Sequence, residues 1–243
     1  MRVPIRRRGA GITPAGQAAQ HNDDRQSSGY ARMAGWSGVA FAVLFTLGLA
    51  LVRQSPGLGA TDADYAAFYA AGPGNVLVTL GLYIVPFAGI ACLWHMNATR
   101  TLLQVLRPRS WSQIPHWLNL AAGVVFVCML FVGAAAVGAV ALLTQFSDAP
   151  LPPPDVARTL SAVGYAAVFV YGVRAAGMYM ITTTGLARSA GLLPRAAAVV
   201  SYLAATFLLV STTFHPAILL VFPAWVLLFS ILLLVRRPSG VTS

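Results

Sequence analysis

The segment Trp117-Leu-Asn-Leu-Ala-Ala-Gly-Val-Val-Phe-Val-Cys-Met-Leu-Phe-Val-Gly-Ala-Ala-Ala-Val-Gly-Ala-Val-Ala-Leu-Leu-Thr144 contains no charged residue. About 20 consecutive apolar residues are enough for an α-helix to cross a bilayer. Similar apolar runs precede and follow this segment. They occupy 34–52, 76–96, 159–187, 196–213 and 216–235. The sequence therefore predicts an all-α polytopic membrane protein with six transmembrane helices.

The composition agrees with this class. Hydrophobic residues make up 58% of the chain, charged residues 9%, and the mean hydropathy is +0.73. Soluble domains carry about 25% charged residues, so a soluble fold of this chain would expose too much apolar surface. Cys92 and Cys128 lie within apolar runs, where we expect them to act as small buried hydrophobic side chains.

The distribution of arginines predicts the orientation. If the six runs are threaded back and forth, most cations collect on the side of the N-terminus: Arg2, Arg6, Arg7, Arg8, Arg25, Arg32, Arg100, Arg107, Arg109, Arg188, Arg195, Arg236 and Arg237. The other side holds Arg53 and Arg158, together with most of the aspartates. Positive flanks mark the cytoplasmic side. We therefore expect a multi-pass protein of a bacterial plasma (inner) membrane with both termini in the cytoplasm.

Three regions follow from this topology. Residues 1–33 are polar and rich in arginine, which predicts a disordered basic cytoplasmic tail that contacts anionic lipid. Residues 34–235 form the transmembrane bundle, and 236–243 form a second cytoplasmic tail. Arg6 and Arg7 are not followed by a hydrophobic region, so we expect the first span to be an uncleaved anchor.

The first outer loop is expected to hold a short amphipathic helix. Thr61-Asp62-Ala63-Asp64 resembles a capping box, and the aromatic residues that follow it have helical spacing. Asp62 and Asp64 beside Tyr65 and Tyr69 are candidates for a gate or docking point at the outer mouth. Helix capping and solvation are the simpler alternative. In the second outer loop, Asp155 is expected to cap the fourth span.

Arg174 is the sharpest feature within a span, because it lies about midway between Arg158 and Arg188. An arginine at the centre of a membrane helix costs about 2.5 to 3.5 kcal/mol, so it must face protein, water or a ligand. The expected partners are carbonyls freed at Pro86 or Pro223, the ring of Tyr171, or an anionic ligand. Helical spacing puts Tyr171 and Met178 on the same face. Arg174, Tyr171 and Met178 therefore form a candidate ligand site, with a purely structural role for the arginine as the alternative.

Several kinds of chemistry are excluded. The chain contains neither Lys nor Glu, which rules out the phosphate-binding-loop lysine, a lysine Schiff base, and zinc or di-iron sites that need glutamate. His95 and His116 are expected at the cytoplasmic surface, which does not suit a bis-histidine haem. We expect no catalytic residue, metal site or cofactor, and no nucleic-acid partner, so the protein is expected not to be an enzyme.

Three short patterns resemble a known group of proteins. They are Arg32-Met-Ala-Gly-Trp36, Asp62-x-x-Tyr-Ala-Ala-Phe-Tyr69, and Leu93-Trp94-His95 with Asn97 and Arg100. Over about residues 30–110 the chain resembles the uncharacterised small polytopic membrane proteins of high-GC actinobacteria. The resemblance implies an actinobacterial membrane setting and no particular chemistry.

Two functions remain. In the first, the bundle binds or transports a small amphipathic or anionic molecule or a lipid around Arg174. In the second, it is a non-catalytic accessory or scaffold subunit that packs against another membrane protein. The small residues of Ala134-x-x-x-Gly138 and Gly172-x-x-x-Ala176 would then provide the contact faces.

Overall fold

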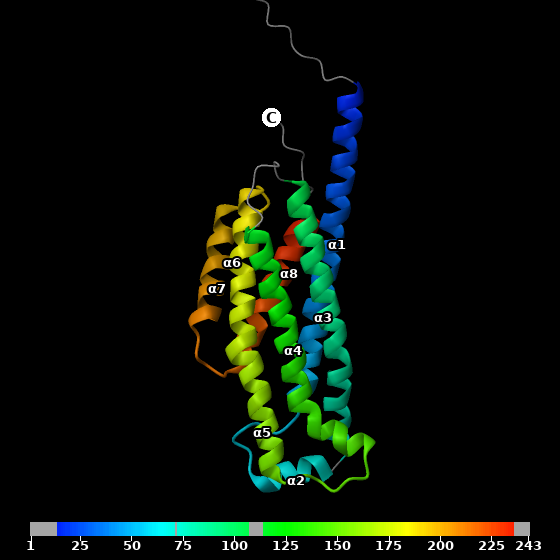
Figure 1. The fold of residues 1–243 in the computed structure, drawn as a ribbon, viewed down its shortest axis with the longest axis vertical. Coiled ribbons are helices and arrows are strands. Elements are labelled where there is room, and N and C mark those ends of the chain that lie inside the picture. Colours follow the sequence, from blue (N-terminus) through cyan, green and yellow to red (C-terminus); the bar gives the residue numbers. More distant parts are fainter. Residues whose placement is uncertain (1–13, 71, 107–113, 236–243) are drawn as a thin grey trace, which may run out of the picture.

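The computed structural model describes residues 14–70, 72–106 and 114–235, and the regular structure in these ranges is helical. Long helices run side by side, while α2 lies across one end of the bundle, here called the α2 end (Figure 1). Segments α5, η1 and α6 follow one another without a break. The elements are α1 (Pro14–Val52), α2 (Asp62–Ala70), α3 (Pro73–Val105), α4 (Ile114–Phe146), α5 (Pro154–Tyr165), the π-helix η1 (Ala166–Gly172), α6 (Val173–Ser189), α7 (Arg195–Val210), the 3-10 helix η2 (Pro216–Leu220) and α8 (Val221–Val235).

Five helical segments of the described chain are long and apolar enough to cross a membrane: 25–52, 74–105, 116–146, 154–189 and 216–235. The all-helical class is thus confirmed for the described residues, and the five long apolar helices are consistent with a helical membrane protein. Helix α7 has 16 residues, which gives it a length of about 24 Å against a hydrocarbon layer of about 30 Å. Helix α1 begins, and α8 ends, toward the end opposite α2 (Figure 1).

The start of α1 differs from the expectation. The sequence predicted a disordered tail up to residue 33, whereas the helix begins at Pro14 and continues to Val52. Proline suits the first turn of a helix, and the alanines and glutamines that follow favour helical structure. The first part of α1 projects beyond the other helices (Figure 1). The predicted tails at 1–13 and 236–243, and Arg107 and Arg109, lie outside the described residues.

Helix α7 ends earlier than predicted. The apolar pattern suggested a span to residue 213, but the helix stops at Val210, and Ser211 is already extended with φ −66° and ψ 131°. Serine and threonine side chains compete for backbone hydrogen bonds, and a residue before proline avoids the helical region. Ser211-Thr-Thr-Phe-His therefore leads as a turn into η2. His215 accepts a hydrogen bond from Ala217 N–H at 3.3 Å and thereby caps the start of η2.

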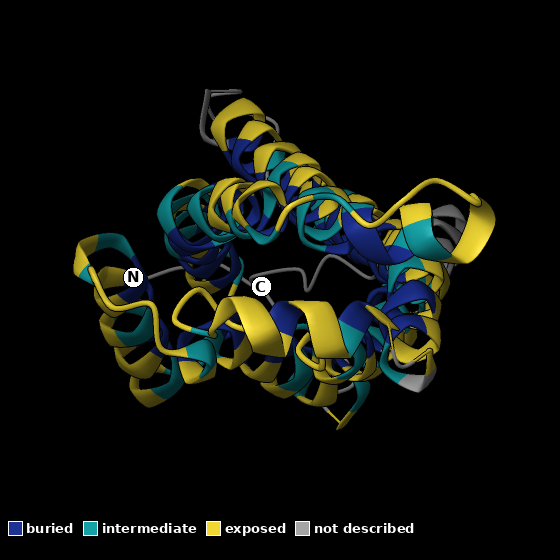
Figure 2. Cartoon of the chain, turned by 90° about the horizontal axis from the view of Figure 1, so that it is seen from below, coloured by how far each residue is buried: buried dark blue, intermediate teal, exposed yellow. Residues whose placement is uncertain are grey.

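The centre of the bundle is an aromatic cluster. Buried positions face the interior and exposed ones face outward when the bundle is seen from the α2 end (Figure 2). The rings of Phe126 and Phe222 lie 4.6 Å apart between centroids, and Phe222 also contacts Phe41, Tyr179 and Trp225. These side chains come from α1, α4, α6 and α8. The cluster therefore joins helices that are distant in the sequence.

Helix α1 approaches its neighbours closely at Gly38. A Cβ atom at this position would lie 2.0 Å from Ser230 Oγ and 2.6 Å from His95 Nδ1, so only glycine permits this packing. His95 Nδ1 also forms a 2.8 Å hydrogen bond with the carbonyl of Ala34. The prediction of a surface position for His95 and His116 is wrong, because their side chains are 0% and 6% exposed.

Candidate ligand-binding site

The guanidinium of Arg174 donates hydrogen bonds to backbone carbonyl groups. Its Nη1 donates to Phe169 O at 3.0 Å and to Val170 O at 2.8 Å, and its Nη2 donates to Ser211 O at 3.2 Å. The π-helix explains the first contact. The N–H of Val173 bonds to Val168 O, five residues back, instead of to Phe169 O. The Phe169 carbonyl therefore takes a hydrogen bond from the guanidinium.

The third contact links two elements. Ser211 is the residue that ends α7, and the last carbonyls of a helix have no partner within it. These carbonyls carry partial negative charge, so a guanidinium is favourable there. Arg174 consequently fixes the end of α7 to the η1–α6 segment. The two ion pairs between described side chains both involve Arg158, not Arg174.

The observed hydrogen-bond partners of Arg174 differ from the predicted ones. The accepting carbonyls belong to η1 and to the end of α7, and not to the helical turns before Pro86 and Pro223. Tyr171 is 61% exposed and Met178 is 36% exposed, so both lie on the outer surface of the bundle. Helical spacing does place them on the face of Arg174, but none of the three residues is among those that line the two cavities within the bundle.

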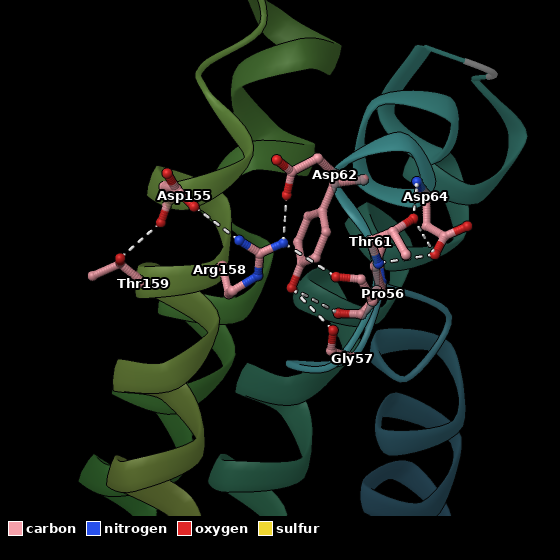
Figure 3. A network of polar contacts seen from close by, with 10 residues as sticks. Pro56, Gly57, Thr61, Asp62, Asp64, Asp155, Arg158 and Thr159 are labelled. Atoms are coloured by element: carbon pink, nitrogen blue, oxygen red, sulfur yellow. Dashed lines mark hydrogen bonds and ion pairs between the residues drawn. The ribbon is translucent and has the colours of Figure 1, made fainter.

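Asp62 and Asp64, two of the predicted outer-mouth residues, take part in a cap of polar contacts at the α2 end (Figure 3). Arg158 Nη2 donates to Asp62 Oδ1 at 2.7 Å and to Ala60 O at 3.1 Å, while its Nη1 donates to Asp155 Oδ1 at 2.8 Å. The guanidinium lies 5.2 Å from the centre of the Tyr65 ring. Arg158 thereby attaches α2 to α5.

The N-terminus of α2 confirms the predicted capping box. Thr61 N–H donates to Asp64 Oδ2 at 2.9 Å, and Asp64 N–H donates to Thr61 Oγ1 at 3.2 Å. The hydrogen bonds from Thr61 lower the pKa of the Asp64 carboxyl below its usual value. This stabilising contribution is present above the ordinary carboxyl pKa and is lost as pH falls through the lowered one.

Two buried tyrosines complete the cap. Tyr65 and Tyr69 are both buried, and the Tyr65 hydroxyl donates to Gly57 O at 3.1 Å. Burial raises the pKa of Tyr69 to about 12, because the charged phenolate is disfavoured away from water. In this arrangement the two tyrosines are packed side chains.

Asp155 does not cap the fourth span as predicted. The N-cap residue of α5 is Pro153, which has no side-chain hydrogen bond, and Pro154 begins the helix. The Asp155 carboxylate instead pairs with Arg158. Proline at the first helical position needs no N–H partner there, which explains why the start of α5 lies one residue before the predicted cap.

A cavity of about 90 Å³ lies in the part of the bundle nearer to the α2 end. Its walls are mostly apolar and come from α1, α3, α4, the α5–η1 segment and η2. The lining residues are Phe45, Gly48, Leu49, Val52, Arg53, Ser55, Val85, Ala88, Leu130, Gly133, Ala134, Val137, Gly164, Tyr165, Val168, Phe169, Pro216 and Leu219. This set is called the main cavity below, because it lies within the bundle, whereas a larger hollow of about 520 Å³ beside Tyr83 and Phe146 is open to the surface. A void of that size accommodates on the order of several water molecules.

Two segments that Arg174 binds also line the main cavity. The Phe169 side chain lines the cavity while its carbonyl accepts the hydrogen bond from Arg174. Pro216 lines another side and directly follows the turn that begins at Ser211, the second anchor of Arg174. Arg174 therefore positions the walls of the cavity. The sequence does not predict the main cavity, because the residues that line it come from separate segments with no common motif.

Arg53 brings a charge to the main cavity. It is exposed at the end of α1, and the described contacts include no hydrogen bond or ion pair of its guanidinium. Among the lining residues it is the one that carries a charge. The combination of an apolar interior and a cation suits a molecule with an apolar part and an anionic end.

Comparison with known proteins adds no further information on this site. No family model, no curated protein and no solved structure matches the chain. Within the described ranges, no group of three or more His, Cys, Asp or Glu side chains is placed to hold a metal ion.

Proposed function

We propose that this protein is a non-enzymatic membrane protein of a bacterial plasma membrane that binds or transports a small amphipathic or anionic molecule or a lipid. The main cavity is the observation that carries the proposal. Transfer of apolar surface from water into such a site stabilises a complex by about 25 cal/mol per Å². Arg53 would pair with the anionic end of the bound molecule.

The proposed topology has six spans with both termini in the cytoplasm. It is supported by the bias of arginines toward one side. In this orientation the α2 end faces outward, and Arg53 lies near the head groups of the outer leaflet. Molecules of the outer leaflet could then enter the main cavity with their apolar part first.

Arg174 has a positioning role in this proposal. Its three bonds to Phe169, Val170 and Ser211 hold the walls of the main cavity. Tyr171 and Met178 are exposed and would contact lipid. The proposed ligand site thus lies beside Arg174 but is centred on the main cavity.

The accessory or scaffold function is less well supported, because the small-residue faces are used within the chain. A Cβ atom at Gly138 would lie 2.2 Å from Leu82 on α3, and one at Gly172 would lie 3.5 Å from Met129 Cβ on α4. Ala134 lines the main cavity. These residues therefore serve internal packing and the cavity rather than a free surface.

The test uses the full chain in lipid nanodiscs with dodecyl phosphate as an anionic probe and dodecanol as a neutral one. Ala134→Leu fills the main cavity and should weaken binding of both probes at least tenfold. Ala135→Leu is the matched control, because Ala135 is exposed on the same helix. It should bind like the wild type. Arg53→Gln should weaken dodecyl phosphate more than dodecanol, because it removes only the charge.

Native mass spectrometry of protein taken gently from its own membranes provides a second readout. A bound small molecule that is present in the wild type and in Ala135→Leu, and absent from Ala134→Leu, would support the proposal and give the mass of the ligand. Equal binding by Ala134→Leu and the wild type would contradict it. A co-purifying membrane protein with no small molecule would favour the accessory function instead.

A further inference from the structure

A second, smaller void lies next to the main cavity. It measures about 10 Å³ and is lined by Phe126, Val173, Ala176, Leu208, Ile218 and Phe222 together with three residues of the main cavity. These three are Phe45, Val168 and Leu219. Side chains that line both spaces stand between them. The two spaces therefore form one interrupted path along the bundle.

The path is closed at its inner end. The Phe126 and Phe222 rings, which line the small void, are 4.6 Å apart in an edge-to-face arrangement, and Phe222 stacks on Trp225 at 6.2 Å. At its other end the main cavity reaches Arg53 and Ser55. The path thus has a polar end and a closed aromatic end.

The lining along α1 gives the length of the main cavity. It runs from Phe45 to Val52, which corresponds to about 10 Å at 1.5 Å per residue, and Arg53 follows directly after the helix. A narrow apolar space with one cation at one end matches a linear alkyl chain with an anionic head group. A compact or multiply charged molecule would leave the apolar walls uncovered.

We propose that the ligand carries a single linear alkyl chain with an anionic head, and that Phe45, Val168 and Leu219 limit the length of chain that the site accepts. This inference rests on the proposed function. The head group pairs with Arg53, and the chain runs toward Phe45. Once the chain reaches these three side chains, additional methylene groups must stay outside the protein.

Binding of a series of alkyl phosphates, from hexyl to hexadecyl, to the full chain in nanodiscs tests the inference. Affinity is referred to the free probe in water, after the uptake by empty nanodiscs has been subtracted. On that scale each methylene that enters an apolar site should strengthen binding about fourfold. For the wild type, affinity should rise with chain length and then reach a plateau. Phe45→Ala joins the two spaces, so the affinity of this variant should keep rising for at least two methylenes beyond the wild-type plateau. Its affinity for the longest probes should exceed that of the wild type at least tenfold.

Phe41→Ala is the matched control. Phe41 is on the same helix and contacts Phe45 at 5.5 Å, but it lines neither space. The chain length at which the affinity of Phe41→Ala levels off should be that of the wild type.

Leu219→Ala provides an independent variant, since large-to-small changes in the core reduce stability and Phe45→Ala could fail to fold. Leu219→Ala is also expected to shift the plateau to longer chains.

The outcomes distinguish the limit on chain length from the proposed function. If the wild type binds no member of the series, the proposed function is overturned. If it binds with a plateau that stays in place in both Phe45→Ala and Leu219→Ala, the length limit is overturned while the proposed function stands. A plateau that moves equally in Phe41→Ala would also overturn the length limit.

Discussion

Gly38 shows how much of this bundle depends on single positions. The missing side chain lets α1 lie against Ser230 and His95 at distances that no Cβ atom would tolerate. Because His95 is fully buried and bonded to Ala34, its ring has little room to move. A methyl group at position 38 must therefore push α1 away from α3 and α8.

We expect Gly38→Ala to lower the free energy of unfolding by about 1 to 3 kcal/mol, the usual cost of overpacking a core. Gly29→Ala on the same helix is the control, because nothing lies within 4 Å of its Cβ position. It should leave stability unchanged or raise it by up to about 1 kcal/mol, since alanine favours helix. Denaturation in matched detergent micelles measures both. Equal stability of the two variants would contradict the close approach at Gly38.

At the level of elements, Arg174 joins η1 to the end of α7. Helix α7 is short, and its last carbonyls lack partners of their own. Arg174→Leu should therefore loosen the last turn of α7 and speed amide exchange at 207–211 roughly fivefold to thirtyfold, as expected for a loss of about 1 to 2 kcal/mol. Hydrogen exchange read by mass spectrometry measures this change.

Tyr171→Leu serves as the comparison for Arg174→Leu, because Tyr171 is exposed and lies one helical turn away. Exchange in α7 should stay at the wild-type rate in this variant. If Arg174→Leu also left exchange in α7 unchanged, the hydrogen bond to Ser211 would not hold the helix end.

The elements also show what sequence can predict. Apolar length predicted the long helices, and Thr61-x-x-Asp64 predicted the start of α2, because both signals are local. The π-helix and the partners of Arg174 depend on how α6 and α7 meet, and no local pattern records that. The main cavity is harder still, since Phe45, Ala134 and Leu219 become neighbours only in the folded bundle.

For the whole molecule, the proposed topology requires that α7 crosses the membrane. In the six-span topology, a fluorescent reporter that folds only in the cytoplasm should be bright when fused after residue 243. A fusion at residue 150, in the second outer loop, should be dark, and one at residue 192 should be bright. In a five-span topology with the same N-terminal orientation, the fusion after residue 243 would be dark.

Helix α1 runs without interruption from Pro14 to Val52, and its first turns stand clear of the bundle (Figure 1). A continuous helix behaves as a rigid rod, since bending it sharply requires a proline, a bulge or a broken hydrogen bond. A torque applied to the projecting part is consequently transmitted along the rod. The same helix contributes Phe45 and Val52 to the main cavity. Mechanical load at one end of α1 would therefore change the shape of the cavity at the other.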